Sequence, residues 1–126
     1  AADAAVVEAL RLVRLPYHLS ALTQAAAITA VRHAGPMLAT VGEIREQRDR
    51  LAVALLELGY RVHDSGANFL LVGGFADPAA TFTALRERGI LIRDLAIEGH
   101  LRMTAGTEAE TTALIAALTE LAPNDR

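Results

Sequence analysis

The chain has 126 residues, of which 52% are hydrophobic, so it is long enough to bury one core and too short for two domains of ordinary size. A formal net charge of −3 and a pI near 5.8 argue against a nucleic-acid partner, because nucleic-acid surfaces are usually basic. The absence of cysteine excludes disulfides and thiolate metal sites and is typical of a reducing compartment, and the longest uncharged stretch, residues 15–31, is too polar to span a membrane. We therefore expect one cytoplasmic domain that binds neither nucleic acid nor membrane.

The first half of the sequence predicts three helices. The first covers residues 3–15 and ends before a proline, which cannot continue a helix. Ser20 is a typical N-cap for the second, over residues 21–33, which Gly35–Pro36 would close. Apolar residues spaced by three, four or seven predict the third helix over residues 37–58.

After residue 59 the apolar period changes from helical to alternating, which is typical of strands. Asp77 is a typical N-cap for a further helix, and Thr107 with Glu110 has the spacing of a capping box. The predicted elements are strands over residues 60–64, 68–74, 90–93 and 100–104, a helix over 78–88, and a last helix after 107. This order predicts an α+β domain in which helices cover a small, mostly antiparallel sheet.

Each of the last two predicted strands carries one arginine. Side chains alternate across a strand, so Arg93 and Arg102 should lie on the face opposite the apolar residues that face the helices. A guanidinium in such a run must be paired or must point into a polar cleft, since an unpaired buried charge is costly. The arginines could face solvent or pair with Asp94 or Glu98; alternatively, they could bind a carboxylate or phosphate, which guanidinium grips with two hydrogen bonds.

Five motifs in order, "RLPYHLSALTQAAA", "REQRDRLAVALLELGYRV", "DSGANFLLVG", "RGILIRD" and "HLRMTAGT", together resemble the C-terminal part of the histidinol-phosphate aminotransferases. The resemblance covers nearly the whole chain and implies the small domain of a fold-type I pyridoxal-phosphate enzyme. It also implies that Arg102 binds the α-carboxylate of the amino-acid substrate and that Arg93 contacts the substrate phosphate. The implied substrates are histidinol phosphate and glutamate or 2-oxoglutarate, and the implied parent enzyme is a cytoplasmic homodimer of histidine biosynthesis.

All basic residues of the chain are arginine, so no side chain can form a Schiff base with pyridoxal phosphate. In the family that the chain resembles, the lysine and most other cofactor ligands lie in a large domain that precedes this region. The resemblance therefore implies that residues 1–126 are the small domain, that residues 1–16 lead in from the large domain, and that the cofactor binds outside this chain. We expect no catalytic or cofactor-binding residue here, and no activity of the chain alone.

Other candidate residues carry weaker signals. The histidines have no helix-face pairing of the metal-site kind, so we expect no metal; they are His18, His33, His63 and His100. Gly73–Gly74 lacks the spacing of a phosphate loop and indicates the end of a strand. Tyr17 and Asn68 lie in motif-like stretches, where they could contact substrate or cofactor or serve packing and turns.

Three other functions remain open at this point. The same motifs are compatible with a related aromatic aminotransferase or with a phosphothreonine decarboxylase of the same fold. A third possibility, from another class, is a free-standing α+β module that binds a small molecule on its sheet. Arg93 and the presence of a large domain are the features that distinguish these functions.

Overall fold

The computed structural model describes residues 2–15 and 19–122, which form five helices and three strands. The chain divides into two compact units, Ala1–Met37 and Leu38–Arg126. Among the described residues, no helix is both long and apolar enough to cross a membrane.

The first unit contains α1 (Ala4–Val13) and α2 (Ala21–Arg32), and both helices were predicted. The Ser20 side chain caps α2 by accepting a hydrogen bond from the backbone N–H of Thr23 at 3.1 Å, as its residue type predicts. Neither helix contains a buried residue. The proline predicted to end the first helix, Pro16, lies outside the described residues.

The predicted boundary between the second and third helices is wrong. The second helix ends at Arg32, and α3 (Ala34–Glu57) begins two residues later, so Gly35–Pro36 lies inside the first turn of α3. Proline is tolerated there because the first N–H groups of a helix have no carbonyl partner within the helix. The break falls instead at His33, whose φ of −111° and ψ of 35° depart from helical values.

The second unit is built around a three-stranded antiparallel sheet in the order β1 (Arg61–Val62), β2 (Phe69–Gly73) and β3 (His100–Thr104). The α+β class and the antiparallel pairing are confirmed, but two predicted strands are shorter than expected. The predicted strand over residues 60–64 is reduced to β1, and that over residues 90–93 is reduced to one bridge at Arg93.

The short pairing at Arg93 has a local cause at each end. Before it, the N–H of Ile90 donates to the Leu85 carbonyl at the end of α4 (Pro78–Glu87) and is unavailable to a sheet neighbour. After it, the Asp94 carboxylate accepts the N–H of Ala96 at 2.8 Å, and Ala96 has a φ of 54°, so the chain turns away. The segment therefore meets β3 at a single residue.

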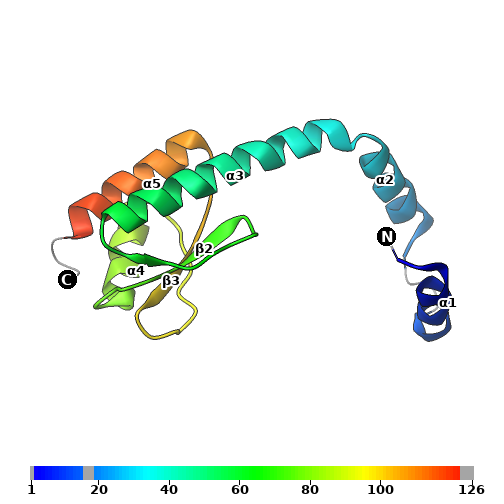
Figure 1. Ribbon diagram of the computed structural model, residues 1–126, viewed down its shortest axis with the longest axis horizontal. Helices are drawn as coiled ribbons and strands as arrows, with labels where there is room; N and C mark the ends of the chain where they lie inside the picture. The colour runs from blue at the N-terminus through cyan, green and yellow to red at the C-terminus, as the bar shows by residue number, and fades with distance from the viewer. Residues whose placement is uncertain (1, 16–18, 123–126) are drawn as a thin grey trace. The chain divides into compact units, whose positions relative to one another are not determined.

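The core lies on one face of the sheet, between the strands and the helices α3, α4 and α5 (Glu108–Leu121), whose arrangement is visible in Figure 1. Its largest fully buried apolar side chains come from α3, β2, α4, β3 and α5; they are Leu51, Leu55, Val72, Leu85, Leu101, Met103 and Leu118. Fully burying such a side chain contributes about 1.5 to 3 kcal/mol, so this cluster fixes the sheet on the helices.

The predicted capping box at the start of α5 is confirmed. The Thr107 side chain accepts the N–H of Glu110, and the Glu110 carboxylate accepts the Thr107 N–H at 2.7 Å and its hydroxyl at 2.9 Å. These hydrogen bonds, the backbone one first, hold the pKa of Glu110 below its ordinary value of 4.5. A Cβ at Gly106 would lie 2.6 Å from the carboxylate, so a larger residue there would require the Glu110 side chain to shift.

We predict that Glu110→Gln removes part of the acid sensitivity of this chain. Because folding lowers the pKa of Glu110, its stabilising contribution is fully present above pH 4.5 and is lost as the pH falls through the lower folded value. Thermal unfolding midpoints measured against pH should therefore fall less steeply below pH 4.5 in the variant. Glu108→Gln, in the same first turn, is the matched control. Parallel acid limbs for the wild type and Glu110→Gln would contradict the prediction.

Candidate anion-binding site

The face of the sheet that points away from the core carries the two predicted arginines. In β3, Leu101 and Met103 are fully buried while Arg102 and the other alternate residues are not. We call this second face the open face and define it by Phe69, Leu71, His100, Arg102 and Thr104. The predicted alternation in this strand is confirmed.

Arg93 lies on the open face directly beside Arg102. The two residues exchange backbone hydrogen bonds, with N–H to O distances of 2.9 and 2.8 Å. Residues paired in this way have Cα atoms about 5.5 Å apart and side chains on the same face. Ile90 and Ile92 pack on the core, whereas Leu91 is 79% exposed, so the predicted alternation of this segment is also confirmed.

The surroundings of the two guanidinium groups differ. Arg93 is exposed, and Arg102 is half-buried with its Cζ 4.8 Å from the centre of the Phe69 ring. The Nε of Arg102 is buried and has no hydrogen-bond partner. Among the described residues, neither arginine forms an ion pair, which contradicts the alternative in which Asp94 or Glu98 neutralises them. The open face therefore presents two neighbouring, uncompensated cations, an arrangement suited to an anion.

Two histidines that the sequence left separate meet on the same side of the sheet. The Nε2 atoms of His63 and His100 are 3.2 Å apart, and Nδ1 of His100 lies 2.6 Å from the Glu98 carbonyl oxygen, to which it must donate. The His100 ring lies against Gly73, its partner on β2, where a Cβ would lie 2.6 Å from Nε2 of His100. The hydrogen bond between His63 and His100 gives each of the two imidazole rings a polar partner. Within the described ranges, no three metal-ligating side chains gather.

The remaining sequence candidates take backbone roles or lie outside the described part. Asn68 is exposed, and its carbonyl accepts the N–H of Ala105 at 2.9 Å. The predicted strand end is confirmed, because β2 stops at Gly73 and Gly74 has a φ of 99°. Tyr17 and His18 lie outside the described residues.

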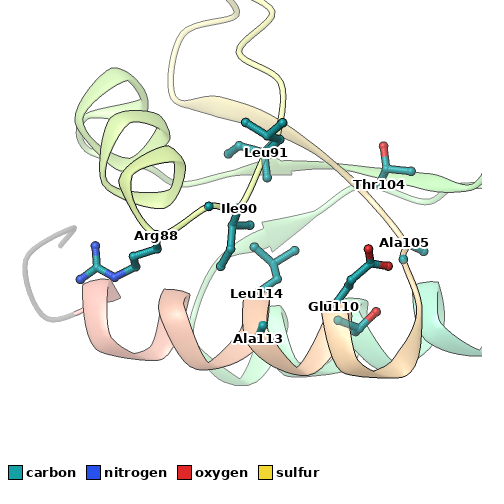
Figure 2. Close-up of a pocket in the computed structure, with 12 residues that line it drawn as sticks. Arg88, Ile90, Leu91, Thr104, Ala105, Glu110, Ala113 and Leu114 are labelled. Atoms are coloured by element: carbon teal, nitrogen blue, oxygen red, sulfur yellow. The ribbon is translucent and has the colours of Figure 1, made fainter.

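A cavity of about 510 Å³ lies between α5 and the segment around residues 88–92 and meets the open face only at Thr104 (Figure 2). Its lining is mostly apolar, with Ile90 and Leu114 facing each other across it. Its one arginine, Arg88, lies 3.8 Å from the Glu120 carboxylate. Because Arg93 and Arg102 do not line this cavity, we place the candidate site on the open face.

Phe69 is the residue of this site that sequence reasoning missed. Alternation within "NFLLVGG" indicates which side of the strand it occupies, but its neighbour depends on the register between β2 and β3, in which Phe69 opposes Thr104. The aromatic residue two positions from Leu71 is the available signal. It becomes informative only once Leu71 is known to oppose Arg102.

Comparisons with known proteins identify the family of this chain. Residues 1–118 match the family described as aminotransferase class I and II. The histidinol-phosphate aminotransferase of Mycolicibacterium smegmatis is 52% identical over 122 residues, which are 97% of this chain and 32% of that protein. The chain thus spans about a third of the length of the curated relatives that it matches.

Solved structures with a similar fold include an aminotransferase and a decarboxylase. A putative aminotransferase from Burkholderia pseudomallei has a TM-score of 0.83 and 32% identity, over 95% of this chain and 38% of that one. The L-threonine-O-3-phosphate decarboxylase from Porphyromonas gingivalis has a TM-score of 0.74 and 25% identity, over 95% and 39%. The fold of this chain therefore has counterparts in a putative aminotransferase and in a phosphothreonine decarboxylase.

Proposed function

Because the chain belongs to the class I and II aminotransferases, we propose that it is the C-terminal small domain of a histidinol-phosphate:2-oxoglutarate aminotransferase. The observation that carries the proposal is the pair of uncompensated guanidinium groups at Arg93 and Arg102 on the open face. The name shared by the curated relatives supports the choice of substrate. Residues 1–16 would lead in from a large domain, and the whole enzyme would be a cytoplasmic homodimer.

In this proposal the chain binds and orients the substrate. Arg102 grips the anionic group common to both half-reactions, which is the α-carboxylate of glutamate or 2-oxoglutarate and the phosphate of histidinol phosphate. Arg93 adds a second positive charge about one strand spacing away. A phosphate dianion can bind both guanidinium groups, whereas a carboxylate with one charge depends less on the second. Two guanidinium groups on neighbouring backbone segments thereby let one site accept two kinds of anion.

The residues of this chain do not fit the covalent attachment of pyridoxal phosphate, since lysine is absent from the sequence. The family implies that cofactor for the whole enzyme, where it supplies an electron sink for amino transfer. Its binding residues would then lie outside these 126 residues. We assign no proton transfer to this chain, because none of the described side chains near the arginines has a defined acid or base role.

A substrate panel with the full-length protein tests the proposal. We expect the highest kcat/KM with histidinol phosphate and 2-oxoglutarate, measured by glutamate formation. Higher kcat/KM with phenylalanine or tyrosine would instead identify a related aromatic aminotransferase. Release of carbon dioxide from phosphothreonine would identify the decarboxylase, which the structural similarity to that enzyme makes the second candidate. Binding of these compounds without turnover would identify a binding module.

A further inference from the structure

Arg102 has an aromatic contact but no polar anchor for its side chain. Its backbone pairs on one side with Arg93 and on the other side with Leu71 of β2. Its Nε, in contrast, has no hydrogen-bond partner, and no described carboxylate pairs with the guanidinium. A long arginine side chain has many rotamers, and part of this freedom is lost when a ligand immobilises the group.

Phe69 supplies the contact that restrains this side chain. It begins β2 opposite Thr104, so its ring reaches Arg102 diagonally across the two strands, a distance that aromatic and long side chains can bridge. The Cζ of Arg102 lies 4.8 Å from the ring centre, within the range of an attractive cation–π contact. A ring on one side of the guanidinium leaves the N–H groups at its edges for a carboxylate or phosphate.

A second arginine over a phenylalanine provides an internal comparison. On α4, the Cζ of Arg86 lies 5.8 Å from the centre of the Phe82 ring, near the limit of such contacts. Phe82 is half-buried and packs against the core, as Phe69 is half-buried in the sheet. The pair on α4 is therefore a matched control for the loss of a phenylalanine ring.

We infer that Phe69 is a positioning residue for Arg102, holding the guanidinium in the orientation that receives the anionic group of the substrate. The inference rests on the proposed function, in which Arg102 binds that group. A cation–π contact of this kind corresponds to about a two- to thirtyfold effect on binding. Because the ring touches no reacting atom in this assignment, its loss should act on KM and leave kcat nearly unchanged.

The test uses the full-length enzyme with glutamate as substrate. Phe69→Leu and Phe69→Met remove the ring but keep an apolar side chain, and either should raise KM about two- to thirtyfold with kcat within about twofold. Phe69→Tyr keeps the ring and should restore KM to near the wild-type value. Phe82→Leu should leave both constants unchanged. The two ring-deleting variants keep the test available if one of them fails to fold.

Repeating Phe69→Leu in an Arg102→Ala background separates positioning from general stability. The inference requires that Phe69→Leu then causes no further rise in KM, since the group that it positions is gone. An equal rise in both backgrounds, an unchanged KM in the single variants, or no rescue by Phe69→Tyr would overturn it. If Arg102→Ala alone leaves kcat/KM unchanged, the proposed role of Arg102 fails as well. A large effect of Arg102→Ala with none from Phe69→Leu overturns only the inference about Phe69.

Discussion

Replacing Arg102 by alanine in the full-length enzyme is expected to lower kcat/KM about thirty- to thousandfold with both glutamate and histidinol phosphate. A charge-assisted, bidentate contact to a bound anion contributes about 2 to 4 kcal/mol, and its removal leaves the substrate anion without its main partner. The two substrates should be affected together, because Arg102, half-buried against the Phe69 ring, is the residue proposed to bind the anion of both. Steady-state kinetics with each substrate measures the effect.

Two further variants show whether the loss is specific. Arg102→Lys keeps the charge but not the planar fork of donors, so it should recover only part of the lost kcat/KM. Arg86→Ala removes an arginine of α4 that lies over another aromatic ring and should have no effect. If Arg102→Ala loses less than about threefold with both substrates, Arg102 is a structural residue and the open face is not the substrate site.

The local features of the fold could be predicted because their signals lie within a few residues. The capping box of Thr107 and Glu110 and the N-caps Ser20 and Asp77 all form as the sequence indicates. The break between α2 and α3 was misplaced because Gly35–Pro36 is compatible with a helix end and with a first turn alike. Local sequence alone does not distinguish these two uses of proline.

The candidate site could be predicted only in part, because strand alternation assigns a face but not a neighbour. The positions of Arg93 and Arg102 on one face follow from alternation within each strand. The contact of Arg102 with Phe69 requires the register of β2 against β3. The meeting of His63 and His100, 37 residues apart, depends on the pairing of three strands, and the His100 ring occupies the space that a Cβ at Gly73 would need. Such contacts depend on long-range pairing that no local pattern contains.

Arg93→Ala is expected to distinguish the two substrates that Arg102→Ala affects together. Arg93 is exposed and, within residues 2–15 and 19–122, pairs only through its backbone with Arg102, so its guanidinium can join Arg102 on a doubly charged phosphate. Losing one charge-assisted contact to a phosphate should cost about 1.5 to 3 kcal/mol, or about ten- to hundredfold in kcat/KM for histidinol phosphate. The α-carboxylate of glutamate carries one charge that Arg102 can satisfy alone, and an exposed second cation then contributes no more than about 1 kcal/mol.

Single-turnover kinetics of Arg93→Ala with each substrate measures this difference directly, because each half-reaction can be followed alone. The ratio of the two losses is the informative quantity, since a general loss of stability or of active enzyme lowers both rates equally and leaves the ratio at one. Arg88→Ala, which removes an arginine outside the open face that lies near Glu120, is the matched control and should keep the wild-type ratio. Equal losses with glutamate and histidinol phosphate in Arg93→Ala would contradict the prediction, because Arg93 would then have no selectivity for phosphate.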